Sequence, residues 1–447
     1  MWAFLRALDR AEQRPQLWAA VMAASIGTGL LLKGLIAAVF PIMSAIVYLG
    51  FSGEFRSRES WRRLQIGTGI LIALAIAAPW HILATLRNPP YLYWSLKSAP
   101  GEYHGFFWFY FINEHVLRFL NLRYPHDYNT VPRLYFWLFH LLWLFPWSVF
   151  LPQLLRLSYK PSTREGQTRL LALCWTGFIL LFFTFSSTQE YYSMPCYPAL
   201  ALLLGCAIAG PQTRAVRVEK YILFAIAAAA CAAIVFILTQ VWNLPTPGDI
   251  AQALTQDPDA YTLSLGHMGD LTLASFAYLR VPLMMAGVAL LIGAGGILLL
   301  RGARAYFAIA AMMVLFYQAA RVALVTFDPY LSSRPLAEAL LKAPPGKLIE
   351  DDAYYTFSSV FFYTNRTALL LNGRKTNLEY GSYAPGAPHV FIGDTDLQRL
   401  WPSADRYYLL VEGPSVARIE SLVGKDALHV IAASGGKFLM SNHARAD

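Results

Sequence analysis

The residues best suited to chemistry lie in one aromatic-rich stretch, FFWFYFINEHVLRFL, at positions 106–120. On an α-helix, Glu114, His115 and Arg118 share one face, because they stand at positions i, i+1 and i+4. A guanidinium group binds phosphate oxygens bidentately, and an imidazole can donate a hydrogen bond or ligate a metal. The stretch therefore suits recognition of a phosphate or pyrophosphate group. The alternative is a Glu114–Arg118 ion pair on an interfacial helix, with His115 incidental.

Other polar candidates lie at the ends of apolar segments. Lys33 stands next to Gly34 between two short apolar runs, where it either snorkels to the membrane surface or binds an anion. A polar turn before two prolines consists of Gln189, Glu190, Tyr191 and Tyr192, although tyrosine is also an ordinary residue of membrane interfaces. We expect a solvated loop at Arg123, His126 and Asp127, and polar pairs within the helices at Arg280 and Arg321.

The elements that must position these side chains are membrane helices. Of the 447 residues, 56% are hydrophobic and 14% are charged, whereas soluble proteins have about 25% charged residues, so a water-soluble enzyme is excluded. The apolar runs are continuous and not alternating, which excludes a porin-like barrel. The sequence predicts about nine spans, at 18–32, 35–50, 64–86, 134–155, 170–187, 191–209, 220–241, 280–300 and 305–327. The first two could also be one broken helix.

The distribution of charge predicts the orientation of these helices. Lysines and arginines concentrate in the loops 52–63, 156–169, 210–220 and 301–304, which the positive-inside rule assigns to the cytoplasm together with the N-terminus. Segment 243–270 has four aspartates and no lysine or arginine. The loop 87–133 and the region from residue 328 are then extracytoplasmic. The net charge of +9 is interpreted as membrane topology, so no nucleic-acid partner is expected.

Composition also divides the chain into two predicted domains. Residues 1–327 form the transmembrane domain, with the loop 87–133 and its amphipathic helix 106–120 outside the membrane. Residues 328–447 alternate short β-rich runs with helix-like stretches, which predicts a small extracytoplasmic α/β domain. The four cysteines all lie in apolar segments without metal-type spacing, so neither a disulfide framework nor a zinc site is indicated.

Four stretches, in this order, resemble the GT-C membrane glycosyltransferases. The similarity is to the branch with bacterial dolichyl-phosphate-mannose-protein mannosyltransferase-like proteins and lipid A 4-amino-4-deoxy-L-arabinose transferase. The stretches are GTGLLLKGLIAAVFP (27–41), APWHILATLRNPPYLYW (78–94) followed by FINEHVLRFL (111–120), LFPWSVFLP (144–152) and STQEYYSMPCYPALALLLG (187–205). The resemblance implies an enzyme of the bacterial inner membrane and the cell envelope, with its α/β domain in the periplasm.

By this resemblance, the protein transfers a sugar from a polyprenyl-phosphate donor to a lipid, glycan or protein acceptor on the outer face of the membrane. The partners would be this donor, the acceptor and membrane lipids. Arg118, Lys33 and Tyr192 match positions near the donor phosphate. His115 matches a histidine beside that phosphate or beside a divalent metal ion, and no other cofactor is implied. Such groups would stabilise the charge that develops on the departing phosphate.

The chain departs from the family pattern in two places. Family members have an acidic pair in an earlier outer loop, whose carboxylate is the general base, but the only carboxylates before Lys33 are Asp9 and Glu12, both predicted to be cytoplasmic. The catalytic base is therefore unknown, and we expect a truncated chain that is inactive alone. Thr188 also replaces a lysine that is frequent in the family. Two alternatives remain: a transporter or flippase for a lipid-linked substrate, and a non-catalytic membrane-anchored scaffold.

Overall fold

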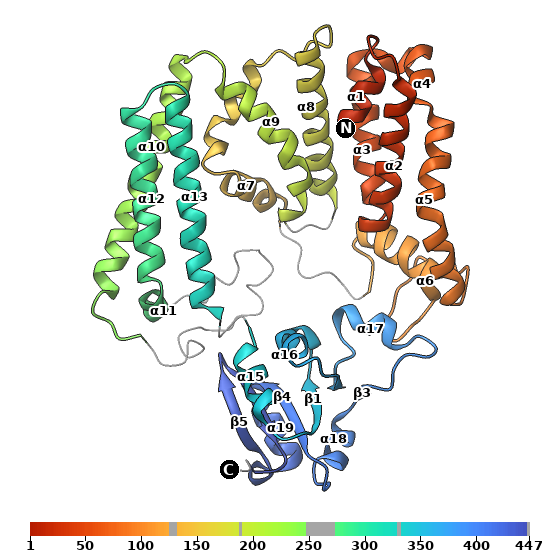
Figure 1. Cartoon of the computed structure of the whole chain (residues 1–447), viewed down its shortest axis with the longest axis vertical. Helices are drawn as coiled ribbons and strands as arrows, with labels where there is room; N and C mark the ends of the chain where they lie inside the picture. The colour runs from red at the N-terminus through yellow and green to blue at the C-terminus, as the bar shows by residue number, and fades with distance from the viewer. Residues whose placement is uncertain (125–131, 187–189, 247–272, 329–331, 445–447) are drawn as a thin grey trace. The chain divides into compact units, whose positions relative to one another are not determined.

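The computed structural model describes residues 1–124, 132–186, 190–246, 273–328 and 332–444 (Figure 1). These residues form two compact units. The first comprises Met1–Ala99 and the described part of His104–Leu223, and the second comprises Pro100–Tyr103 and the described residues from Phe224 onward. The second unit holds both membrane helices and a β-sheet, so the domain boundary predicted at residue 328 falls inside it and stays a prediction.

The first unit is built from helices. Its elements are α1 (Trp2–Leu8), α2 (Pro15–Lys33), α3 (Ile36–Ser52), η1 (Glu54–Arg56), α4 (Arg58–Leu64), α5 (Ile66–Arg87), α6 (Gly105–Phe107), η2 (Trp108–Leu117), α7 (Arg133–Trp143), η3 (Trp147–Arg156), α8 (Arg164–Phe185), η4 (Glu190–Cys196), α9 (Tyr197–Ile208) and the start of α10 (Arg214–Val241). A run this apolar must satisfy its backbone hydrogen bonds internally when it leaves water, which favours a helix. Capping is visible at α8, where the Thr163 hydroxyl accepts the Gly166 N–H at 3.1 Å.

The helices α2 and α3 form a tight hairpin and not one broken span. Gly34 joins them with φ +85°, a backbone conformation that favours glycine. A Cβ atom at Gly29 would lie only 3.0 Å from the Ala37 Cβ, so the two helices approach closely beside the turn. The hairpin brings Lys33, the last residue of α2, to the same end of the unit as the start of α3.

Seven of the described helices are long and apolar enough to cross a membrane, and α3 is a shorter apolar helix. The predicted span 134–155 is wrong as a single helix, because α7 and η3 meet at an angle of 100°. Pro146 stands at the junction between them, and a proline has no N–H to continue the helical hydrogen bonds. The chain is therefore an α-helical polytopic membrane protein, whose described residues include seven helices long enough to span, or eight if this bent pair is one span.

The second unit includes the short α11 (Leu273–Tyr278) and the helices α12 (Arg280–Leu299) and α13 (Ala303–Thr326), of which α12 and α13 are long and apolar enough to cross a membrane. Gly293 and Gly296 of α12 face Met312 and Ala308 of α13 so closely that a Cβ atom on either glycine would overlap its neighbour. Small residues allow such close packing between membrane helices. The predicted polar role of Arg280 is observed, because its side chain donates to the carbonyl oxygen of Val241 at 2.9 Å.

The second unit also carries the predicted α/β domain. Its six-stranded sheet has the order β3-β2-β1-β4-β6-β5, in which β1 to β4 are parallel and β6 is antiparallel to its neighbours. The strands are β1 (Lys347–Asp351), β2 (Ala368–Leu371), β3 (Phe391–Ile392), β4 (Tyr407–Glu412), β5 (His429–Ser434) and β6 (Lys437–Ser441). The helical elements are α15 (Arg334–Lys342), η8 (Tyr354–Phe357), α16 (Ser358–Thr364), α17 (Thr376–Ser382), α18 (Asp394–Leu400), α19 (Gly413–Val423) and η9 (Lys425–Ala427).

Side chains that alternate along β1 fill two separate cores. Leu348 packs with residues of α15 and α16, whereas Ile349 packs with residues of α18 and α19. Because successive side chains of a strand point to opposite faces, helices cover both faces of this sheet. The expected small C-terminal α/β domain is thereby confirmed.

Candidate functional site

The helix that carries the candidate residues does not have α geometry. The sequence predicts an amphipathic α-helix at 106–120, but Trp108–Leu117 is a π-helix that continues the short α6. In a π-helix the backbone bonds join residues five apart, so residues at i and i+5 align. Tyr110 and His115 show this spacing, with ring centroids 4.9 Å apart. Arg118 still reaches Glu114 at 3.5 Å, so the predicted ion pair is present.

Both nitrogens of His115 are used inside the protein. Its Nε2 accepts the backbone N–H of Leu35 at 3.1 Å. Because an amide can only donate, the proton of a neutral ring is on Nδ1, which faces the carbonyl oxygen of Tyr110. A Cβ atom at Gly34 would lie 3.0 Å from His115 Nε2. His115 therefore holds the turn that directly follows Lys33, whose own side chain is exposed.

This geometry does not fit a metal ion at His115. A metal on Nε2 would displace the Leu35 N–H, which is part of the helix start. Among the residues that the structure describes, no group of three or more His, Cys, Asp or Glu side chains is placed to hold a metal. The metal role of His115 stays a prediction, without a supporting donor set among the described residues.

Arg118 links η2 to the turn at the start of α9. Its guanidinium donates to the Tyr192 hydroxyl at 3.2 Å, and its Cζ lies 6.0 Å from the Tyr192 ring centroid. Tyr192 itself packs against a buried cluster that includes Phe40, Phe183 and Cys196. The side chain of Arg118 remains 36% exposed. The guanidinium is thus oriented by a fixed tyrosine and still accessible to a ligand.

Glu114 is shared between two arginines. Arg123 Nη1 contacts both carboxylate oxygens at 2.6 Å, while Arg118 is 3.5 Å away. Arg123 is only 16% exposed, so the expectation of a solvated loop at this residue is wrong. Arg118 and Arg123 thus meet at one carboxylate, and the two arginines form the cationic cluster at this end of the unit. Thr188, Gln189, His126 and Asp127 lie outside the described residues.

A buried amide network supports the same helix, and the sequence reasoning missed it. Asn113 is fully buried, and its Oδ1 accepts the Ser98 hydroxyl at 2.9 Å. Ser98 Oγ in turn accepts the backbone N–H of Tyr124 at 2.9 Å, and Asn113 Nδ2 donates to the Tyr124 carbonyl oxygen at 3.3 Å. The network ties two loops to η2. Its only sequence signal was an amide side chain inside an aromatic run.

A second buried pair supports Tyr192. His140 of α7 contacts the hydroxyl of Ser193 through Nε2 and the carbonyl oxygen of Phe136 through Nδ1. Both His140 and Ser193 are buried. This pair fixes η4 at the residue after Tyr192. An ionisable residue within a predicted span was the available signal, since such residues are rare unless they have a function.

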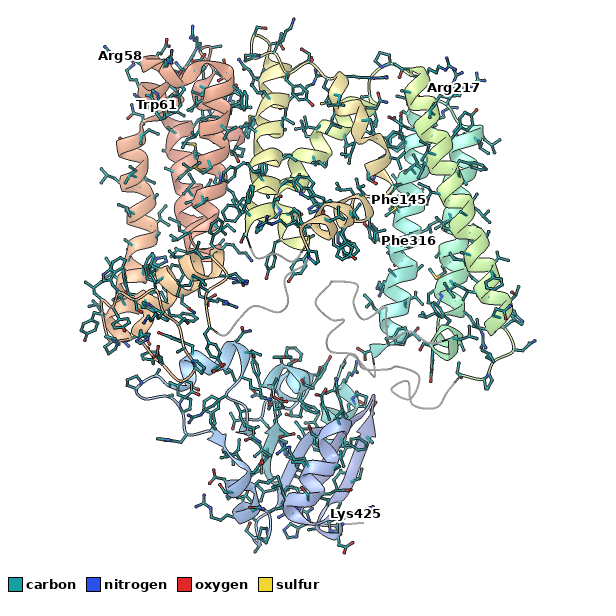
Figure 2. All side chains as sticks on the ribbon, turned by 180° about the vertical axis from the view of Figure 1, so that it is seen from behind. Arg58, Trp61, Phe145, Arg217, Phe316 and Lys425 are labelled. Atoms are coloured by element: carbon teal, nitrogen blue, oxygen red, sulfur yellow. The ribbon has the colours of Figure 1, made fainter. Side chains whose placement is uncertain are left out.

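The basic loops 52–63 and 156–169, predicted to be cytoplasmic, lie at the other end of the first unit. Arg63 donates to the carbonyl oxygen of Ala7 at 3.0 Å, and Arg164 pairs with Asp9 at 3.0 Å. Because α2 runs from this end to Lys33, the cationic cluster and the basic loops lie at opposite ends of the unit. Figure 2 shows Arg58 and Trp61 at the end of the first helices that lies away from the 105–117 helix.

Apolar spans, a bent helix pair, a cationic cluster at one end and an α/β domain define a multi-pass membrane protein with a GT-C-like architecture. The chain is similar to the crystal structure of ArnT from Cupriavidus metallidurans bound to undecaprenyl phosphate, with a TM-score of 0.74, 20% identity, and coverage of 100% of this chain and 73% of that one. The apo structure of the same protein gives a TM-score of 0.68 at 18% identity, over 99% of this chain and 73% of that one. The fold expected from the resemblance is confirmed.

Curated relatives match in sequence over a shorter region. They are undecaprenyl phosphate-alpha-4-amino-4-deoxy-L-arabinose arabinosyl transferases. The protein from Erwinia tasmaniensis is 29% identical over 223 residues, which are 49% of this chain and 36% of that protein. The protein from Pseudomonas aeruginosa PAO1 is 31% identical over 216 residues, 46% of this chain and 34% of that protein. The match thus spans about a third of the length of these relatives, and no family model matches the chain.

Proposed function

We propose that this chain binds a polyprenyl-phosphate-linked sugar and serves in the transfer of that sugar to an acceptor at the periplasmic face of a bacterial inner membrane. The observation that carries the proposal is the accessible guanidinium of Arg118, which is oriented by Tyr192 at 3.2 Å. It lies at the end of the unit opposite the basic loops. The names of the relatives support undecaprenyl phosphate as the carrier and 4-amino-4-deoxy-L-arabinose as the sugar.

The arrangement has the chemistry that such a donor requires. When the bond from the sugar to phosphate breaks, negative charge develops on the departing phosphate, and fixed cations stabilise it. Arg123 neutralises most of Glu114, because it contacts both carboxylate oxygens at 2.6 Å. The Arg118 guanidinium, whose side chain is 36% exposed, can be reached by phosphate oxygens, and Lys33 supplies a second cation on a turn that His115 holds.

The acceptor also has to lose a proton when it attacks the sugar. Glu114 is a poor choice for this base, because two guanidinium groups already contact its carboxylate oxygens. We therefore assign the cluster to donor binding and leave the base to the acidic pair that the family resemblance implies.

Donor binding tests the proposal directly. The chain is purified in lipid nanodiscs, and bound undecaprenyl phosphate is counted by native mass spectrometry as its concentration is varied. We expect saturable binding that Arg118→Gln weakens about tenfold, since a hydrogen bond to a charged group contributes about 1.5–3 kcal/mol. Arg87→Gln is the matched control, because Arg87 is an exposed arginine at the end of α5. Equal affinity of all three proteins would contradict the proposal.

Sugar transfer distinguishes the enzyme from the two alternatives. Membranes that contain the chain are supplied with radiolabelled undecaprenyl-phosphate sugar and with membrane lipid acceptors. Release of free carrier together with labelled acceptor in proportion to time identifies an enzyme, and it would also contradict the expectation that this chain is inactive alone. A flippase binds the donor without cleaving it, and a scaffold shows no Arg118-dependent binding.

A further inference from the structure

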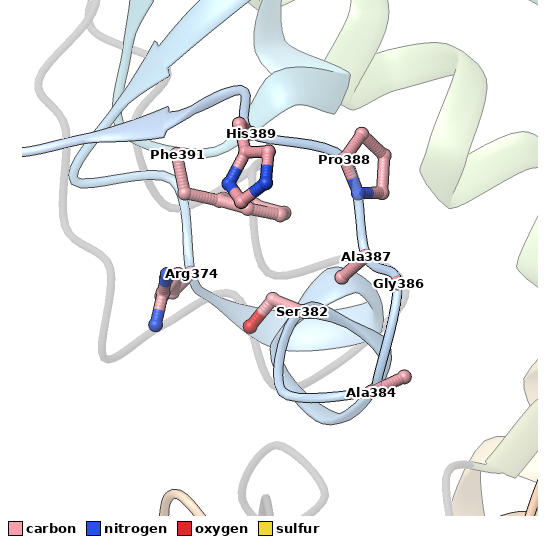
Figure 3. Close-up of a pocket in the computed structure, with 8 residues that line it drawn as sticks. All are labelled: Arg374, Ser382, Ala384, Gly386, Ala387, Pro388, His389 and Phe391. Atoms are coloured by element: carbon pink, nitrogen blue, oxygen red, sulfur yellow. The ribbon is translucent and has the colours of Figure 1, made fainter.

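A small pocket opens in the α/β domain. It encloses about 280 Å³ and is lined by Arg374, Ser382, Ala384, Gly386, Ala387, Pro388, His389 and Phe391. Arg374 follows β2, Ser382 ends α17, and the other residues belong to the connection into β3 and to β3 itself. Figure 3 shows His389 and Phe391 on one side of the opening and Arg374 and Ser382 on the other.

The lining of the pocket favours an anion. It includes a guanidinium and an imidazole but no carboxylate. Of the described residues, none forms an ion pair with Arg374, in contrast to Arg399 and Arg418 of the same domain. Because no acidic partner neutralises Arg374, its charge is available to a ligand.

Two aromatic rings orient the guanidinium of Arg374. Its Cζ lies 5.2 Å from the ring centroid of Tyr383 and 5.4 Å from that of Phe391. Rings that cover a planar guanidinium leave its N–H edge for hydrogen bonds, and this edge matches two phosphate oxygens. The Ser382 hydroxyl is already used, because it donates to the Glu379 carbonyl oxygen at 2.7 Å. Arg374 and His389 are thus the donors of the pocket.

The size of the pocket limits the ligand to a small headgroup. Pockets for complete small molecules enclose about 300–1,000 Å³, so a volume of about 280 Å³ suits one phosphate group with part of the sugar or glycerol that bears it. We propose that this pocket binds a phosphate monoester carried on a lipid or a glycan. The binding of this phosphate group does not depend on the proposed function.

Arginine footprinting on the full chain in nanodiscs tests the pocket. Phenylglyoxal modifies accessible arginines, and peptide mass spectrometry reports the rate at Arg374 and Arg399 in the same sample. Arg399 is the internal control, an exposed arginine paired with Asp396 at 2.8 Å on α18. With glycerol 3-phosphate at about four times its Kd, the rate at Arg374 should fall about fivefold, while the rate at Arg399 stays unchanged.

The probes separate the possible sources of the phosphate. Glycerol 3-phosphate and inorganic phosphate represent soluble ligands, and nanodiscs with phosphatidic acid represent a lipid monoester. Phosphatidylglycerol, a diester, and sulfate are the matched negative probes. Protection by monoesters alone supports the proposal. Equal protection by sulfate, or no protection by any phosphate monoester, overturns it.

Variants separate this pocket from the donor cluster. His389→Gln should weaken the protection of Arg374 severalfold, and Arg118→Gln should leave it unchanged. If Arg118→Gln weakens donor binding while Arg374 is still protected, the two sites are independent. If donor binding fails in the wild-type chain but Arg374 is protected by monoesters, the phosphate pocket stands and the proposed function is wrong.

Discussion

Two arginines with the same exposure show how partners decide the role of a charge. The side chains of Arg118 in the first unit and Arg418 in the α/β domain are each 36% exposed. Arg418 pairs with Asp351 and with Asp394, so two carboxylates share one guanidinium. Around Glu114, two guanidinium groups share one carboxylate. We assign the first arrangement to the stability of the α/β domain and propose the second for an anionic ligand.

The largest effect is expected on the stability of the α/β domain when Arg418, which pairs with two carboxylates, is replaced. Arg418→Met leaves the Asp351 carboxylate, 2% exposed, without its ion-pair partner, and breaking such a buried pair costs about 3 kcal/mol. Hydrogen exchange in β1 and β4 should show this loss of stability. Arg118→Gln is the control, because its partners lie outside the sheet. The comparison fails if both variants exchange at the same rate as the wild type.

The stability of the α/β domain should also depend on pH, because buried carboxyl groups lie in and beside its sheet. Burial raises the pKa of Glu350 to about 8, and it raises the pKa of Asp351 and Glu412 in the same direction. A carboxyl whose folded pKa is raised binds more protons in the folded state, so stability falls as pH rises from its unfolded pKa toward the folded one. The α/β domain should lose about 2 kcal/mol between pH 6 and pH 8.

Glu350→Gln provides the control for this pH series. Neither carboxylate oxygen of Glu350 has a hydrogen-bond partner among the described residues, so a neutral amide avoids the cost of burying a charge. Chemical denaturation followed by hydrogen exchange in β1 should show a weaker pH dependence in this variant. An unchanged slope would contradict the assignment to Glu350.

The conservative exchange Arg118→Lys tests the geometry of the donor cluster. A lysine keeps the charge but loses the planar fork that binds two phosphate oxygens. Affinity for undecaprenyl phosphate should fall about fivefold, to a value between those of the wild type and Arg118→Gln. Native mass spectrometry in nanodiscs gives the ranking. A lysine variant that binds as well as the wild type would reduce the role of Arg118 to its charge alone.

The smallest effect is expected at Tyr192. Tyr192→Phe removes the hydroxyl that accepts from Arg118 at 3.2 Å and keeps the ring in its buried cluster. Loss of one such hydrogen bond should weaken donor affinity about threefold. Tyr191→Phe is a neighbouring control, because Tyr191 is exposed. Equal effects in the two variants would indicate that Tyr192 does not position the guanidinium.

Features set by local patterns were predictable from the sequence. The helices of the α/β domain at 334–342 and 394–400 and the turn at 434–436 follow from short-range periodicity and turn residues. The spans follow from hydropathy, because an apolar segment in a bilayer is restricted to a helix. The residues of the α2–α3 turn and of η4 were identified for the same reason, since they interrupt apolar runs.

Features set by distant contacts were not predictable. The Arg123 carboxylate pair and the His140–Ser193 contact join residues from different elements, 9 and 53 positions apart. An aromatic run carries no local signature of a π-helix, so the sequence predicts an α-helix where η2 has π geometry. The predicted Glu114–Arg118 ion pair is still present, because residues four apart remain neighbours in η2.

Photo-crosslinking with a carrier labelled next to its phosphate tests the central claim most directly. The intact chain is reconstituted in nanodiscs with a diazirine-bearing polyprenyl phosphate, irradiated and mapped by peptide mass spectrometry. We predict crosslinks within residues 105–124 and 190–197 that excess undecaprenyl phosphate removes. Crosslinks confined to the basic loops 52–63 and 156–169, with none near Arg118, would contradict a phosphate site at this end of the helices.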